Sequence, residues 1–80
     1  MINIQPILIK RQRPEANNIV VTLINDNLIN SATFQVIYYS NEEYIDIDSV
    51  GCDGNDYENW DNSNEAAIQF VVNKLNLNLV

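Results

Sequence analysis

Carboxylates are the reactive side chains that this sequence offers in greatest number, and they gather in one segment. Nine of the eleven lie between positions 42 and 65, and no Lys or Arg stands among them: Glu42, Glu43, Asp46, Asp48, Asp53, Asp56, Glu58, Asp61 and Glu65. Three of the four cations are Lys10, Arg11 and Arg13. Such a chain can dock by charge onto a neighbour, or imitate a nucleic-acid backbone. It can also simply present a solvated acidic face. The three interpretations remain open.

The acidic segment has the oxygen ligands that calcium prefers, but not their usual spacing. An EF-hand loop that begins at Asp46 needs ligands at its fifth and twelfth positions. Val50 and Tyr57 stand there. Nothing in the sequence sets a distance between any two carboxylates for acid–base catalysis. We therefore predict no metal and no cofactor.

Nucleophilic catalysis also lacks its usual parts. The chain has no His, so neither a Ser nor a Cys has the common general base. Cys52 is the only cysteine, and its acidic neighbours are expected to raise the pKa of its thiol and make it unreactive. With only Gly51 and Gly54, the chain has no glycine-rich phosphate loop. We predict that the protein is not an enzyme and has no small-molecule substrate.

Length and charge limit the remaining functions. The 80 residues carry a formal net charge of −7 and suffice for one small domain with a marginal core. A lone Cys forms no internal disulfide, so association with a partner is the remaining way to stabilise it. The acidic balance argues against nucleic acids and anionic membranes as partners. No targeting signal or membrane span is predicted, which suggests a soluble protein made in a reducing cytoplasm.

The elements that position these residues are predicted to be strands first. Residues 1–9 read as an edge strand that is weakened at Pro6, and residues 10–18 as a polar loop. The continuous β-branched run 19–24 is typical of a strand covered on both faces. A turn at 25–27 follows, with Leu28 and Ile29 as an apolar anchor in the connection.

A hairpin of two alternating strands follows, with its tip at residues 41–42. In residues 33–39, Phe34, Val36 and Tyr38 share one face, and Tyr39 faces the other side. In residues 44–50, Ile45 and Ile47 are expected to face away from Tyr44, Asp46 and Asp48, which leaves one face wet. Tyr39 and Tyr44 are either interface anchors or a simple cross-strand pair.

The last third reads as helix. Residues 56–60 suit one turn, and Asn62 to Glu65 offer helix-capping residues. From about 64 to 75, apolar residues spaced i, i+3, i+4 and i+7 form one stripe: Ile68, Val71, Val72 and Leu75. Trp60 is expected to fill the corner between strands and helix. The predicted fold is α+β, a small antiparallel, sandwich-like sheet of about four strands followed by one C-terminal amphipathic helix. It is a single domain, β-rich over 1–50 and helical over 55–76, with an apolar tail at 77–80.

The C-terminal part resembles small proteins of tailed bacteriophages. The features that carry the resemblance are the hairpin, the corner formed by Tyr57 and Trp60, and a terminal helix that ends in Lys74-Leu75-Asn76-Leu77. The resemblance covers residues 33–80, and Asn76 stands where many relatives have Gly. It implies a minor virion component and brings no functional residues with it.

Two functions follow as expectations. The first is a non-enzymatic structural component of a tailed-phage virion, at the capsid, neck or tail, bound to other virion proteins or to itself as a homo-oligomer. The alternative is a small acidic phage-encoded inhibitor that mimics DNA and blocks a host defence or DNA-binding protein. The candidate interaction residues are Ile2, Ile4, Lys10, Arg11, Arg13, Tyr39, Tyr44, Leu77, Leu79 and Val80.

Overall fold

The four strands form one antiparallel sheet in which each strand pairs with the next along the chain. The computed structural model describes the backbone of residues 1–80 and all side chains except those of Gln12 and Arg13. The sheet order is β1-β2-β3-β4. The elements are β1 (Ile2–Ile9), β2 (Gln12–Asp26), β3 (Ser31–Ser40), β4 (Glu43–Asp53), α1 (Asn55–Asn59) and α2 (Asn64–Lys74). The predicted α+β class and strand number are confirmed, and the predicted single helix is preceded by a short one.

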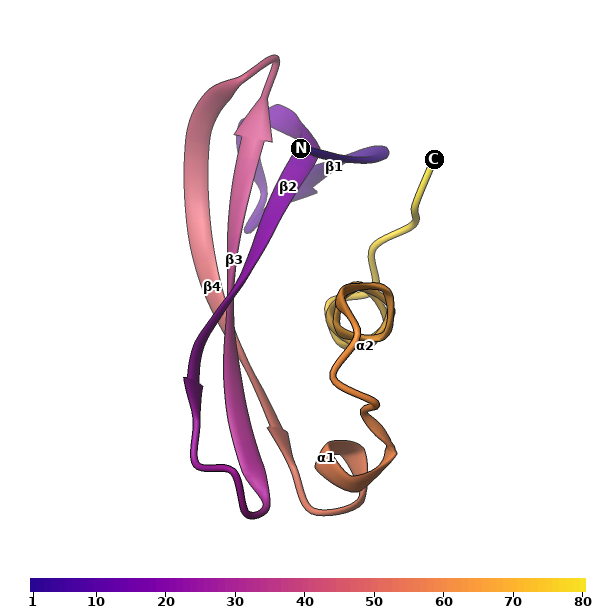
Figure 1. Cartoon of the computed structure of the whole chain (residues 1–80). Helices are drawn as coiled ribbons and strands as arrows, with labels where there is room; N and C mark the ends of the chain where they lie inside the picture. The colour runs from indigo at the N-terminus through magenta and orange to yellow at the C-terminus, as the bar shows by residue number, and fades with distance from the viewer.

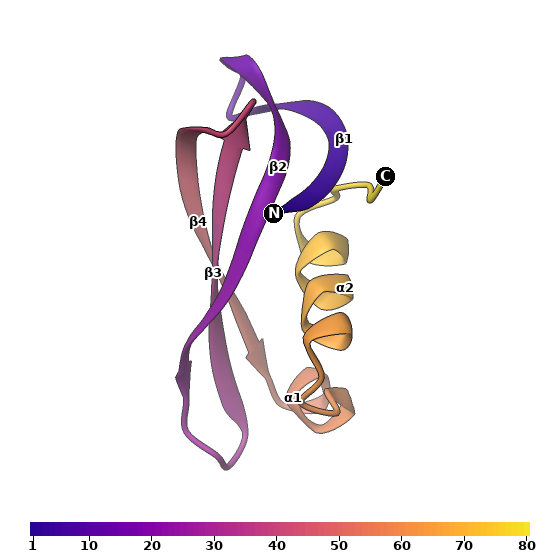
Figure 2. The ribbon, with the colours of Figure 1, turned by 45° about the horizontal axis from the view of Figure 1, so that its top comes forward.

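Both helices lie on the same side of the sheet (Figures 1 and 2). β1 curls away from β2 over that side and meets the C-terminal tail (Figure 2). The body is elongated, at 38 × 20 × 19 Å. Neither helix of the described chain is long and apolar enough to cross a membrane.

The core lies between the helix-facing side of the sheet and α2. Phe34, Val36 and Tyr38 are buried on β3, as their alternation predicts. Val71 and Val72 are the buried members of the predicted helical stripe. Ser63 caps α2, because its Oγ accepts a hydrogen bond from the Ala66 amide at 3.1 Å. The predicted span of 64–75 therefore agrees with Asn64–Lys74 to within one residue.

Trp60 occupies the corner between the sheet and α2, as predicted. Its ring meets Phe34 edge to face at 5.2 Å between centroids, and it meets Tyr57 at 6.1 Å. Its Nε1 donates to the Ser63 carbonyl at 3.2 Å. The aromatic cluster thus fixes the path of the chain from β4 into the cap of α2.

The predicted loop at residues 10–18 is wrong. β2 begins at Gln12, and only Lys10 and Arg11 form the turn, with φ of 53° and 60°. Two-residue hairpin turns need this left-handed backbone, which Asn and Gly adopt most easily. A Lys-Arg pair therefore gives no turn signal, and Pro14 weakens the strand signal after it.

The predicted facing of the strand after the hairpin is also corrected. Tyr38 pairs with Asp46 but Tyr39 pairs with Tyr44, so Ile45 is an extra residue in β4. This β-bulge moves Tyr44 to the side opposite Asp46. Asp46 and Asp48 consequently lie on the helix-facing side of the sheet, opposite Tyr38 and Val36, and Ile47 faces the other way.

Only one face of the sheet is covered in the described structure. The run 19–24 predicted a strand buried on both faces, yet Val20 is half-buried and Thr22 is exposed. Both pair with β3 residues that alternate with its buried ones. The side of the sheet away from the helices is hereafter called the open face.

Candidate functional site

The predicted contact segments at the two ends of the chain bind one another. Ile4 and Leu79 form an isolated antiparallel bridge. The Gln5 amide donates to the Asn78 carbonyl at 2.8 Å, and the Val80 amide donates to the Asn3 carbonyl at 3.2 Å. The tail therefore pairs with the curled edge of β1, where the sequence predicts contact with a neighbouring protein.

The five apolar interaction residues predicted at the two chain ends differ in how far their side chains are buried. Ile4 and Leu77 belong to the core, and Ile2 and Leu79 pack partly against it. Val80 alone leaves its side chain in solvent. Four of these five side chains are thus used to fold the chain itself.

The basic turn folds back on the acidic strand. Lys10 Nζ lies 3.2 Å from Asp46 Oδ2 and 3.7 Å from Asp48 Oδ1. Arg11 is exposed beside it, and the Arg13 side chain lies outside the described residues. The separation of charge that the sequence shows is therefore reduced in space at Lys10.

The carboxylates of this cluster already have partners. The Tyr38 hydroxyl donates to Asp48 at 3.0 Å, and burial together with this bond raises the pKa of Tyr38. The Ile47 amide, followed by Lys10, holds the pKa of Asp46 below its ordinary value. The hydrogen bond to Asp46 and the charge of Asp48 raise the pKa of Lys10. Because Lys10 is half exposed, these ion pairs add little stability.

The two predicted tyrosines meet on the open face. Tyr39 and Tyr44 are register partners, because the bulge at Ile45 turns Tyr44 to that side. The Tyr44 side chain is 61% exposed, and Tyr39 is half-buried. Next to them, Ile37 pairs with Val20 on one side and with Ile47 on the other. A row of three apolar residues thus crosses the sheet beside a pair of tyrosines.

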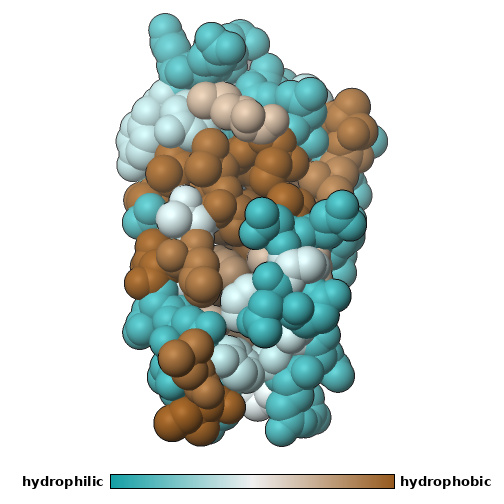
Figure 3. Space-filling model, viewed as in Figure 1, coloured by the Kyte–Doolittle hydropathy of each residue, from teal (hydrophilic) through white to brown (hydrophobic). Residues whose placement is uncertain are grey.

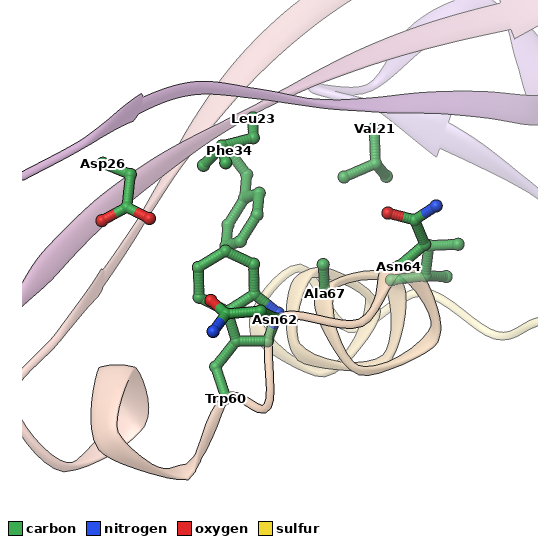
Figure 4. A pocket seen from close by; sticks show the side chains of 9 residues that line it. Val21, Leu23, Asp26, Phe34, Trp60, Asn62, Asn64 and Ala67 are labelled. Carbon is green, nitrogen blue, oxygen red and sulfur yellow. The ribbon is translucent and has the colours of Figure 1, made fainter. Parts of the chain in front are cut away.

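A cleft opens on the other side of the sheet, beside the lower half of β2. Since β1 begins opposite Ile19, β2 has no strand on its β1 side from Val20 to Asp26 in the described chain. The cleft has a volume of about 360 Å³, and Figure 4 shows Phe34 reaching across it from the sheet to Trp60. Six apolar residues line it, namely Val21, Leu23, Phe34, Trp60, Ala67 and Ile68. Three polar residues, Asp26, Asn62 and Asn64, complete the lining.

The loop between β2 and β3 exposes two apolar side chains. Leu28 and Ile29, predicted as an anchor in the connection, are 82% and 79% exposed, so that prediction is wrong. Figure 3 shows the apolar surface that projects at this end of the molecule. The Asn27 side chain accepts hydrogen bonds from the amides of Ile29, Asn30 and Ser31, which holds the loop in one shape.

Cys52 and the acidic side chains are the remaining reactive groups. Cys52 is buried, and burial followed by the charge of Asp56 raises the pKa of its thiol. Among the side chains that the structure describes, no three His, Cys, Asp or Glu residues come together to hold a metal ion. The candidate functional site is the open face, with its apolar row and its pair of tyrosines.

Sequence reasoning found Tyr39 and Tyr44 but missed the row beside them. Val20 and Ile37 belong to strands that the sequence predicts. Ile47 belongs to the strand whose facing is corrected above, since it lies on the open face while Asp46 and Asp48 face the helices. The signal that could have found the row was the β-branched run 19–24, which is typical of a strand covered on both faces. The cleft had no signal, since its wall combines distant parts of the chain.

Comparison with known proteins adds no relative. A scan of protein-family models, a search of curated proteins and a search of solved structures each found no match to this chain.

Proposed function

We propose that this chain is a non-enzymatic structural component of a tailed-phage particle, at the capsid, neck or tail, and that it acts through contacts with other proteins. Its place is the virion, after synthesis in the host cytoplasm. The phage assignment rests on the resemblance of residues 33–80. The mode of action rests on the molecule itself.

One observation carries the proposal of a contact protein. The sheet has a second face with apolar residues at its centre and no layer to cover it: Val20, Ile37 and Ile47 lie side by side there. Apolar surface left in water by an isolated subunit is recovered as stability when a partner covers it. A small domain that functions only in an assembly can therefore leave this layer to its neighbours.

Mimicry of DNA has less support from the arrangement of the acids. It needs carboxylates that are free and spread along one elongated face. Asp46 and Asp48 are instead bridged by Lys10, and Asp48 also accepts the Tyr38 hydroxyl. The paired residues of the open face include Asp53, opposite Ser31 at one end, while the four rows beyond it carry no acid.

The test is mass spectrometry of phage particles purified from the source of this sequence. We expect the chain in fixed proportion to the major capsid or tail protein, after washing at a salt concentration that removes loosely bound protein. If the chain is found in the infected cell but not in particles, the structural role is wrong. A pull-down with host nucleases would then examine inhibition.

A further inference from the structure

Asp53 pairs with Ser31 at one end of the open face, but the twelve paired residues that follow along this face contain no charge. They form four rows of three, with one residue each from β2, β3 and β4: Asn25, Thr33 and Gly51; Thr22, Gln35 and Ser49; Val20, Ile37 and Ile47; Asn18, Tyr39 and Tyr44. All four cations and all eleven acids of the chain stand at other positions. A sheet face built for water normally carries charged side chains, so this face differs from the rest of the molecule.

The middle of the face has the composition of an interface core. Ile47 is 37% exposed although it is one of the largest apolar residues of β4. Aromatic residues are enriched in interfaces and charged ones are depleted at their centres, and both hold for this face. Thr22, Gln35 and Ser49 can exchange hydrogen bonds with a partner without leaving a buried charge.

Charge decides which partner fits. Two copies of this chain each carry −7, so most approaches between them are repulsive. In the four uncharged rows of the open face two copies can meet without opposing carboxylates, because Asp53 lies at the end of the face. A basic partner would gain its electrostatic attraction from the acidic segment and not from this face.

We propose that the open face is the interface of a homodimer in which the sheets of two copies pack face to face. A two-fold axis brings the same patch of each copy together, and aligned sheets pack with their inner side chains interdigitated. The resulting order of layers is helix, sheet, sheet, helix, which places the run 19–24 between two covers. This inference rests on the proposed function, in which the open face is a contact site. It adds that the partner at this site is a second copy of the chain.

The test is the molar mass of the whole 80-residue chain, measured by sedimentation equilibrium from about 1 to 500 µM. We expect twice the 9.2 kDa chain mass at the upper end. Ile47→Lys places a like charge at the centre of each half, and we expect it to weaken the dimer at least about tenfold. Tyr44→Lys tests the same face at a side chain so exposed that the fold does not depend on it.

Ile29→Lys is the matched control, because it makes the same change at a more exposed position in the β2–β3 loop. It should leave the dimer intact, and far-ultraviolet circular dichroism should show all variants folded. The proposal fails if the chain is monomeric throughout, if neither face variant weakens the dimer, or if the control weakens it equally. A monomer that is present in particles refutes only the dimer, whereas a dimer absent from particles refutes only the virion role.

Discussion

Single residues in this chain take their roles from partners that are remote in sequence. Asp46 and Asp48 looked like part of a solvated acidic strand. One extra residue, Ile45, turns them to the helix-facing side, where Lys10 and the Tyr38 hydroxyl reach them. These carboxylates therefore bond to polar groups at the edge of the core, and they are not free to bind a ligand.

Asp61 gives a test of stability against pH at the residue scale. The hydroxyl and amide of Ser63 bond to its carboxylate and hold its pKa below the ordinary value of 3.8. Since the folded pKa is the lower one, ionised Asp61 stabilises the fold above 3.8, and this contribution is lost as pH falls through the folded value. We expect Asp61→Ala to lower the melting temperature at pH 7, with a gap to the parent chain that narrows below pH 3.8.

Asp61→Asn is the control for this prediction. An amide oxygen still accepts the Ser63 N–H bond, which spans 2.9 Å in the parent chain, but carries no charge that titrates. Its smaller loss should not vary with pH in this range. A gap for Asp61→Ala that stays constant down to pH 2 would show that ionisation of Asp61 does not contribute.

At the scale of elements, the C-terminal tail completes β1. β1 curls away from the sheet, so part of its edge faces the end of α2 instead of another strand (Figure 2). Asn76 has φ of 55°, a left-handed residue that ends the helix and turns the chain back. The tail then reaches β1 and buries Leu77, so an edge open to aggregation is partly closed by the chain itself.

This arrangement predicts that the tail stabilises the isolated chain. Leu77→Ala removes a buried side chain and should lower the free energy of unfolding by about 2–4 kcal/mol, measured by urea denaturation. Val80→Ala, at an exposed position of the same tail, should change it by no more than about 0.5 kcal/mol. If the two variants are equally stable, the tail does not dock on its own chain and is available to a partner, as the sequence suggested.

For the molecule as a whole, the net charge opposes association between copies and the apolar surface of the open face favours it. A charge of −7 keeps copies apart, while the uncharged, apolar centre of the open face favours bringing them together. The Lys10 ion pairs reduce the separation of charge that would support head-to-tail docking. Contact through the open face therefore depends on apolar burial and not on ion pairs.

Salt distinguishes these two modes of association. Screening weakens the repulsion between two like-charged copies, so raising sodium chloride from about 20 mM to about 300 mM should tighten a dimer formed by the open face. The dissociation constant from sedimentation equilibrium should fall several-fold. A dissociation constant that rises with salt would instead indicate docking between opposite charges, with Lys10 and Arg11 as the cations to substitute.

The sequence by itself determined the features that depend on neighbours along the chain. Alternation gave the facing of β3, and helical spacing gave the buried stripe of α2. Turn and cap residues placed the tip between β3 and β4 and the start of α2 near Ser63. Each of these follows from local backbone geometry or from composition, so no tertiary contact was needed.

The tertiary structure alone decided what depends on distant contacts. The turn at Lys10 and Arg11 forms because the pairing of β1 with β2 outweighs the poor turn propensity of those residues. The bulge at Ile45 reverses the facing of Tyr44, and no composition signal marks it. The C-terminal tail pairs with β1, and both helices cover one face of the sheet and leave the other open. The alternation of a strand indicates which side chains are favourable to bury. Only the packing of the whole chain determines which element covers each face of the sheet.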